Sequence, residues 1–484
     1  MRARQAELDW KFLADEELVA PWPPARSSRV GSSKDSAYHH IRLLVRVGLV
    51  MILVTAGIGG LYARNQALKG IAEVEDGVQA AVAAEQWVQQ HAPELTAEML
   101  LDNDASDYVE WMAIRERELL AAISQVEEPN ATLEVGNTWF VGDHAAVELM
   151  VTVAGAKVGN GAIYRQTRFY RETPQGWLRT QPNLELWGPS GSVETDHLLW
   201  RYRRRDEAAV LEIAEATDAV YLQLIRDYGV TGPEDGSKLA VDVRADYRPG
   251  RIWLQEEPET RVVVPSPSVY LTPRGIMHPE ILEQAAALAL LESVTAQARQ
   301  RHGIRRSEAL LSGMKLWQVW KMDLPLSPWS VSAVRWMYGG AGDEGEDVLT
   351  GSEFSKELCA AYSIWMIWPA SVDIPVYCEG KSISPMIGSA GLNSVPGGPY
   401  DLTALELEGA VGYPSTWAIE TGYLLKMYTV VDYAVSTYGR DRLPDLVAVL
   451  GEHGYWESLI PAVFGVSVDE FERGWQEHVA KMVE

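Results

Sequence analysis

Few side chains in this sequence have the type and spacing needed to bind a metal ion. A zinc site on a helix uses two histidines three or four residues apart, because residues at that spacing share one helical face. No two histidines of the chain have either spacing. The histidines are His39, His40, His91, His144, His197, His278, His302, His453 and His478. The usual helical zinc motif is therefore absent from the sequence.

The chain has only two cysteines, Cys359 and Cys378. Their spacing matches neither a zinc knuckle nor a redox pair, which excludes a zinc site built from cysteines. Outside the cytoplasm the two could form one disulfide. Two buried thiols are an equally good interpretation, since free cysteine behaves as a small apolar residue.

Ser312 and Lys315 have the S-x-x-K spacing that begins the active site of serine β-lactamases and penicillin-binding proteins. The S-D-N and K-T-G motifs that complete such a site are absent from the chain. A four-residue pattern this loose recurs by chance. We therefore do not predict a serine nucleophile here.

The charge balance of the chain is strongly acidic. Its 484 residues include 67 acidic and 42 basic side chains, which gives a net charge of −25. A nucleic-acid-binding protein needs a broad basic surface, so no nucleic-acid partner is expected. At 47% apolar residues the chain can build the cores of two or three domains of ~100–200 residues each.

Residues 43–63 form a candidate membrane anchor. Residues 47–63 carry no charge, and a snorkelling Arg46 extends the apolar run to the ~20 residues that cross a bilayer. Residues 1–46 hold eight basic and six acidic side chains. The positive-inside rule then places a flexible tail, residues 1–42, in the cytoplasm and the bulk of the chain outside. A cleaved signal peptide is the alternative, but about forty residues precede the apolar run.

Residues 70–188 are predicted to form an α+β domain. Val78 and Val82 lie one helical turn apart, and strands with alternating apolar residues follow, separated by turns at 142–143 and 174–176. This order resembles the SnoaL-like, or nuclear-transport-factor-two-like, cone, in which a curled antiparallel sheet wraps around a helix. The resemblance is one of pattern and implies no particular activity.

An arginine cluster, Arg201 and Arg203 to Arg205, follows this unit. Acidic residues flank it in the sequence, among them Glu194 and Asp206. A solvated or salt-bridged strand end is therefore a better interpretation than an anion site.

Residues 193–484 read as a strand, a helix over about 206–228, short strands and then mostly helices. The final helix begins at a capping box of Ser467 and Glu470. The whole succession, and the stretch 438–482 above all, resembles the gluzincin-type (MA-clan) metallopeptidase-like domains of bacteria. The resemblance implies a mostly helical domain with a small sheet at its N-terminal side.

Gluzincins bind zinc through the two histidines of an H-E-x-x-H helix and a downstream glutamate, and the glutamate of the motif activates a water. In the alignment that the resemblance implies, Leu291 and Thr295 replace the histidines and Ser312 replaces the third ligand. Only Glu292, at the base position, and Gly313 match the family. Leucine cannot coordinate zinc and neutral hydroxyls are poor ligands. The resemblance therefore implies a degenerate peptidase without a metal or other cofactor.

Together these features predict a multidomain α+β protein with one transmembrane helix, a cone-like domain and a degenerate peptidase-like domain. The expected function is binding, scaffolding or sensing outside the cell, with the membrane and a peptide, protein or glycan as partners. Two alternatives remain open. One is an active cell-surface zinc metallopeptidase with non-standard ligands around Glu292. The other is a transmembrane regulator that acts through its short cytoplasmic tail.

Overall fold

The computed structural model describes most of residues 131–483 and a short helical segment before them. The described residues are 76–84, 86, 131–153, 162–233, 236–246, 261–269, 272–274, 277–304, 308–322, 402 and 417–483. All of them belong to one unit, Glu73–Glu484. The expected tail, the expected membrane segment 43–63 and both cysteines lie outside the described residues.

The first sheet is an antiparallel meander that β9 extends. Its strands are β1 (Ala131–Val141), β2 (His144–Val153), β3 (Ala162–Thr173), β4 (Gly176–Arg179) and β9 (Thr272–Pro273). β9 pairs with β3. The predicted turns at 142–143 and 174–176 both join antiparallel neighbours. Gly142 has a φ of 59°, a left-handed conformation that glycine adopts without steric cost.

Helical residues 76–84 cover part of this sheet. Val78 and Val82, one turn apart, are both buried with Val147 and Leu149 of β2. The predicted helical spacing of these two valines is therefore confirmed. Their side chains supply the helical side of a small apolar core.

The expected curled cone is wrong. β2 and β3 stay in register over their whole paired length, from His144 opposite Arg171 to Val153 opposite Ala162. Sheets acquire strong curvature from bulges and glycine kinks. Between β1 and β2 the pairing shifts once, between Val135 and Thr138. Two small sheets, neither of them curled, take the place of the expected architecture.

The expected transmembrane helix has no counterpart in the part of the chain that the structure describes. Within the described ranges, no helix combines the length and the apolar character required to cross a bilayer. The fold class of the described residues is therefore α+β with two small sheets, and the expected class is corrected accordingly.

The second sheet contains a parallel β–α–β unit. Its strands are β5 (Ser190–Glu194), β6 (Leu198–Arg203), β7 (Leu239–Arg244) and β8 (Arg261–Pro265), in that spatial order. β5 is antiparallel to β6, whereas β6, β7 and β8 run parallel. Helix α4 (Glu207–Asp227) joins β6 to β7, because parallel neighbours need a long crossover.

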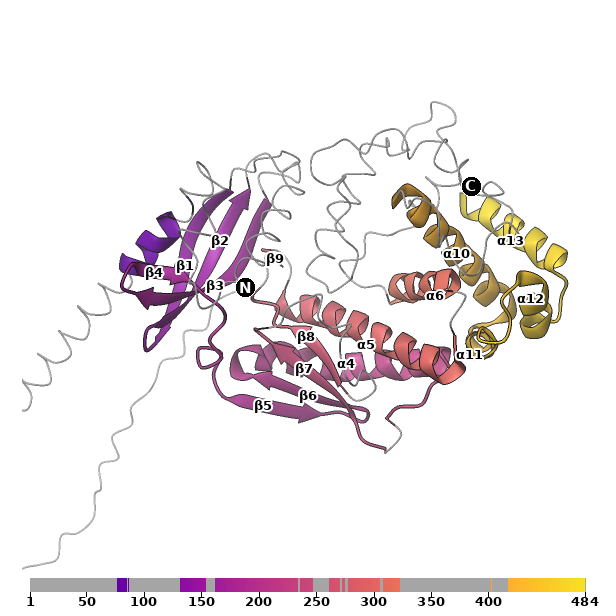
Figure 1. Ribbon diagram of the computed structural model, residues 1–484, viewed down its shortest axis with the longest axis horizontal. Helices are drawn as coiled ribbons and strands as arrows, with labels where there is room; N and C mark the ends of the chain where they lie inside the picture. Colours follow the sequence, from indigo (N-terminus) through magenta and orange to yellow (C-terminus); the bar gives the residue numbers. More distant parts are fainter. Residues whose placement is uncertain are drawn as a thin grey trace, which may run out of the picture. The chain divides into compact units, whose positions relative to one another are not determined.

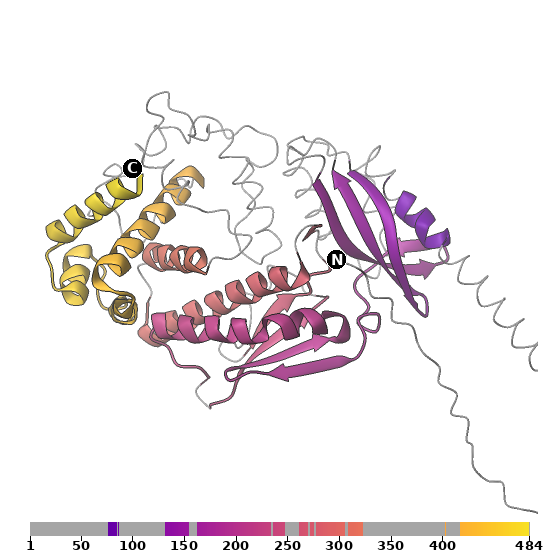
Figure 2. The same ribbon diagram turned by 180° about the vertical axis from the view of Figure 1, so that it is seen from behind.

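Helices α4 and α5 (His278–His302) pack together on one face of this sheet (Figures 1 and 2). Strand residues alternate between faces. Trp200, Val241 and Val262 are buried in the core under the helices. The intervening positions carry mostly polar and charged side chains, so the opposite face of the sheet is available for a polar site.

The remaining described helices follow α5 in the chain. They are α6 (Glu308–Lys321), α10 (Trp417–Tyr438), α11 (Leu443–Val449), α12 (Trp456–Phe464) and α13 (Val468–Val483). Gly313 lets α6 approach α10 closely, because a Cβ at this position would collide with Met427. The Ser467 hydroxyl accepts a hydrogen bond from the Glu470 amide (3.2 Å), which confirms one half of the predicted capping box.

An ion pair between the half-exposed Arg440 and a buried carboxylate ties α4 to the helices that follow it. Asp227, at the end of α4, is 2% exposed. Its carboxylate accepts hydrogen bonds from the guanidinium of Arg440 (2.6 Å at Nη2), from Gln318 (2.6 Å) and from Gln223 (2.8 Å). A buried carboxylate is stable only when such donors compensate its lost hydration.

The variant Arg440→Ala should therefore destabilise the protein by about 2–3 kcal/mol, because it leaves the charge of Asp227 buried without its counter-ion. The matched control is Arg442→Ala, whose pair with Asp445 is exposed on both sides. That variant should cost under about 1 kcal/mol. Urea unfolding followed by circular dichroism measures both. Equal shifts of the two midpoints would refute the structural role of Arg440.

Candidate functional site

The predicted zinc-ligand positions do not assemble into a metal site. Leu291 is 2% exposed and lies in the core. The Thr295 hydroxyl donates a hydrogen bond to the Leu291 carbonyl oxygen (2.7 Å), the i−4 bond that threonine forms inside helices. Ser312 lies partly buried on the neighbouring helix, α6. Leu291 and Thr295 are thus committed to packing and to the helix backbone.

Glu292 is held by an ion pair with Lys315. The Lys315 ammonium, on α6, donates to both carboxylate oxygens of Glu292, on α5, at 2.8 and 3.1 Å. The two side chains are 21% and 30% exposed. The ammonium group thus takes one acceptor position on each carboxylate oxygen and places a positive charge beside Glu292.

Glu292 and Lys315 belong to two separate sequence motifs, and their contact was not predicted. They are 23 residues apart. The rotation and register of two packed helices decide which side chains meet across them. No pattern within either helix encodes that register, so the signal available in the sequence was limited to the opposite charges.

No metal cluster is present elsewhere in the described ranges: no three His, Cys, Asp or Glu side chains gather there in a way that could hold an ion. The exposed Asp143 and the half-buried His144 form a local pair at the tip of the β1–β2 hairpin (2.8 Å). Asp143 belongs to the turn and His144 begins β2. They provide no third ligand.

Asp206 is a second candidate because its titration is strongly perturbed. Burial raises the pKa of Asp206 to about 6, although hydrogen bonds from Ser266 and Trp187 act in the opposite direction. The Ser266 hydroxyl donates at 2.6 Å and the indole of Trp187 at 3.1 Å. Beside it, Arg205 stacks 3.6 Å over the ring of Trp139. These contacts join Trp139 of β1 and Trp187, which lies between β4 and β5, to the segment just before α4, so we assign Asp206 a structural role.

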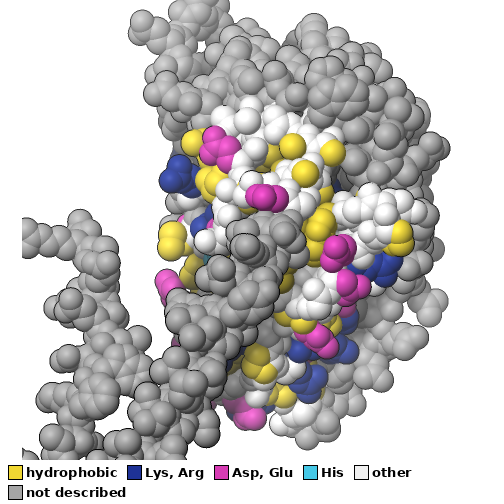
Figure 3. All heavy atoms as spheres, turned by 90° about the vertical axis from the view of Figure 1, so that its left-hand side faces the viewer, with side chains coloured by type: hydrophobic (Ala, Val, Ile, Leu, Met, Phe, Trp, Pro, Cys, Tyr) yellow, Lys and Arg dark blue, Asp and Glu magenta, His cyan; other side chains and the backbone are white. Residues whose placement is uncertain are grey.

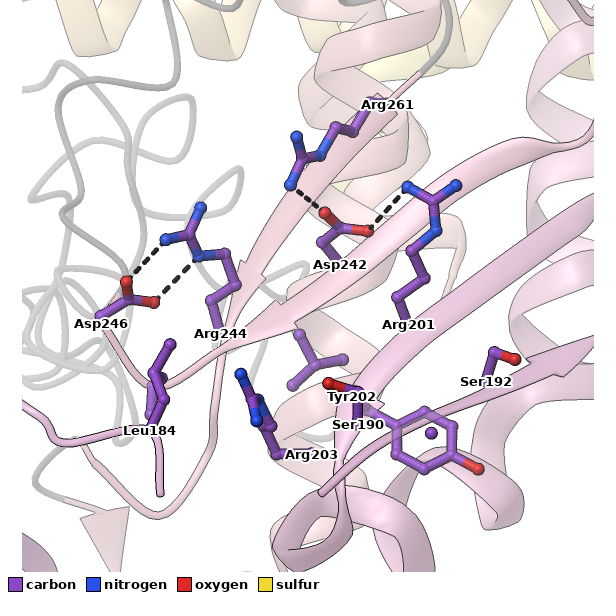
Figure 4. Close-up of a pocket in the computed structure, with 13 residues that line it drawn as sticks. Leu184, Ser190, Ser192, Arg201, Tyr202, Arg203, Asp242, Arg244, Asp246 and Arg261 are labelled. Atoms are coloured by element: carbon purple, nitrogen blue, oxygen red, sulfur yellow. Dashed lines mark hydrogen bonds and ion pairs between the residues drawn. The ribbon is translucent and has the colours of Figure 1, made fainter. Parts of the chain in front are cut away.

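The strongest candidate for a binding site is an open groove of about 550 Å³ on the polar face of the second sheet (Figure 4). We call it the arginine groove, after the four arginines that line it: Arg201, Arg203, Arg244 and Arg261. Asp242, Asp246, Ser190 and Ser192 also line it. Four basic and two acidic side chains give the groove a local excess of positive charge in an acidic protein.

Strand register explains how the groove is assembled. Arg201 on β6 lies directly opposite Asp242 on β7. Arg203 and Arg244 are each two residues further along these parallel strands, and so they share the same face and lie next to each other. Arg261, at the start of β8, reaches Asp242 from the other side.

Ion pairs inside the groove hold three of the four arginines. Asp242, only 6% exposed, lies between the guanidinium groups of Arg201 and Arg261 (Figure 4). Its distance to Arg201 is 3.8 Å, and the pair with Arg261 is closer. Asp246 accepts two hydrogen bonds from Arg244, at 2.9 and 2.6 Å. The salt-bridged strand end that the sequence predicted is thus partly confirmed.

Arg203 differs from the other three. Its Nη1 donates to the carbonyl oxygen of Gly188 (3.1 Å), and no carboxylate among the described residues forms an ion pair with it. Figure 4 draws no interaction from Arg203 to another residue of the groove. Its charge is therefore the one that the described part of the groove leaves uncompensated.

Comparison with models of known protein families, with curated proteins and with solved structures found no match for this chain. The resemblances to the SnoaL-like cone and to gluzincins therefore rest on sequence pattern. The site must be interpreted from its own geometry.

The raised pKa of Asp206 makes stability depend on pH. A carboxyl group whose folded pKa, about 6, lies above its usual value of 3.8 favours the folded state while it is protonated. That contribution is present below pH 3.8 and is lost as the pH rises through 6. Asp206→Asn carries an uncharged amide that can keep one bond to each partner, so its stability relative to the wild type should rise by up to about 3 kcal/mol between pH 4 and pH 8.

Thermal unfolding at several pH values measures this difference. Asp143→Asn is the control, because Asp143 is exposed at a hairpin tip. If the stability difference from the wild type depends on pH in the same way for Asp206→Asn and for the control, the pKa of Asp206 is not raised in the folded protein.

Proposed function

We propose that this chain is a catalytically inactive, peptidase-like protein that acts by binding or scaffolding. The observation that carries the proposal is the ion pair between Lys315 and Glu292. The charge asymmetry and apolar run of residues 1–63 support an extracytoplasmic site of action at the cell membrane.

The ion pair argues against hydrolysis because a general base needs a carboxylate oxygen directed at a water. Both oxygens of Glu292 instead accept hydrogen bonds from one ammonium. A metal ion at this point would meet the positive charge of Lys315 with no ligand from Leu291 or Thr295. Electrostatics and ligand chemistry thus favour the same inactive state.

The serine-nucleophile pattern is disfavoured by the same contact. Activation of Ser312 in an S-x-x-K site would require Lys315 as its base or hydrogen-bond partner. Lys315 is the partner of Glu292 on the adjacent helix. Glu292 and Lys315, the two residues whose sequence patterns suggested catalysis, therefore bind each other.

A peptidase assay tests the proposal. The purified full-length chain and Glu292→Gln are incubated with a fluorogenic peptide library and added zinc, beside a known active gluzincin as the positive control. We expect no turnover above background in either form. Because the ion pair is partly exposed, Glu292→Gln should change the unfolding free energy by less than about 1 kcal/mol.

Turnover by the wild type that a chelator abolishes, and that Glu292→Gln lacks, would overturn the proposal in favour of an active metallopeptidase. The variant Lys315→Met serves as a further control, since it removes the ammonium while retaining the length of the side chain. Inactivity of this variant is expected too, because Leu291 still cannot bind zinc.

A further inference from the structure

We infer that the arginine groove binds a small polyanion, a ligand that carries at least two carboxylate or phosphate groups. The inference deepens the proposed binding function by naming a site and a chemical class of ligand. It rests on that function, but its residues, on β5 to β8, are separate from Glu292 and Lys315 on α5 and α6.

The groove contains a buried carboxylate that orients two of its arginines. Asp242 is 6% exposed, and one of its oxygens, Oδ1, is buried without a hydrogen-bond donor. Arg201 lies 3.8 Å from that oxygen, which is an ion-pair distance rather than a hydrogen bond. Arg201 is thus held in place electrostatically while its N–H donors remain available to a ligand.

Arg203 and Arg244 supply a second, stronger argument. Like charges on neighbouring strands destabilise a sheet unless something compensates them. Asp246 compensates Arg244 through two hydrogen bonds. Arg203 has only the Gly188 carbonyl as a partner among the described residues. An oxyanion placed between these neighbours would accept hydrogen bonds from both guanidinium groups, a geometry that arginine forms well.

The surroundings suit a small ligand rather than a macromolecule. A volume of about 550 Å³ falls in the ~300–1,000 Å³ range typical of small-molecule sites. Arg203 and Arg244 are the last residues of the parallel strands β6 and β7, and ligands of open α/β sheets bind at the carboxyl ends of strands. The hydroxyls of Ser190 and Ser192 add neutral donors.

A nucleic acid is a poor alternative occupant. Its backbone requires a basic surface that extends well beyond one groove, and the chain carries a net charge of −25. On the face of the molecule that Figure 3 shows, the described acidic and basic side chains are intermingled. The excess of positive charge is a local property of the groove, which favours a compact anion.

Calorimetric titration of the purified full-length chain tests the inference. Inorganic pyrophosphate probes phosphate recognition, and citrate probes carboxylate recognition, both at low and at moderate salt. We expect saturable binding of at least one probe, weakened by salt. Arg203→Ala should weaken it at least about tenfold, the loss expected from removing one charge-assisted contact. Arg203→Lys should retain part of the affinity, because it keeps the charge but loses the fork.

Arg442→Ala is the matched control, since Arg442 is an exposed arginine outside the groove, and its affinity should equal that of the wild type. Melting curves of each variant verify that the fold is intact. Absence of binding of both probes to the wild type, or equal affinities of wild type and Arg203→Ala, would overturn the inference. The peptidase assay tests Glu292 and Lys315, which lie outside the groove. Absence of anion binding would therefore leave the proposal of a catalytically inactive protein unaffected.

Discussion

The ion pair between Lys315 and Glu292 is the interaction on which the functional interpretation depends. It exists because α6 lies against α5 in one particular register, and that register is constrained from the other side by the close approach of Gly313 to Met427 on α10. A larger residue at 313 would push α6 away from α10. The glycine and the ion pair together place an ammonium group, rather than a metal ligand, opposite Glu292.

Several carboxylates that are buried in the described structure also depend on hydrogen-bond donors from other elements. Asp432 receives hydrogen bonds from Trp317 (2.9 Å) and His478 (3.0 Å), with Lys321 at 3.1 Å. Asp227 and Asp206 are likewise surrounded by donors on distant segments. Each buried acid thus joins elements far apart in the chain. The arginine groove reverses this balance, because there the basic side chains outnumber the acidic ones, and this is why it stands out as a site.

Local features of the fold could be predicted from the sequence. The helix expected over 206–228 is α4, and the turns at 142–143 and 174–176 are present where expected. The alternation of apolar and polar residues and the residue types of turns are local features, so they can be recognised without knowing which segments pack against them. The curl of the first sheet was predicted wrongly because it depends on how far strands stay in register, as β2 and β3 do without interruption.

The candidate site was harder to predict than the fold. The arginine cluster was visible, but the sequence suggested that its nearest acidic neighbours would neutralise it. Glu194 pairs with Lys238 instead. The acids that reach the groove are Asp242, on β7, and Asp246, in the turn after β7, both beyond a helical crossover. A crossover helix lets two strands pair in parallel, and this pairing brings residues together that are far apart in the sequence. The spacing of residues in the sequence does not predict such contacts.

The most direct test of the central claim is equilibrium binding of zinc to the purified full-length chain, measured by dialysis and elemental analysis for the wild type and for Glu292→Gln. With an ammonium opposite Glu292 and leucine and threonine in the histidine positions, we expect no stoichiometric zinc in either form. One tightly bound zinc ion per wild-type chain, lost in Glu292→Gln, would contradict it.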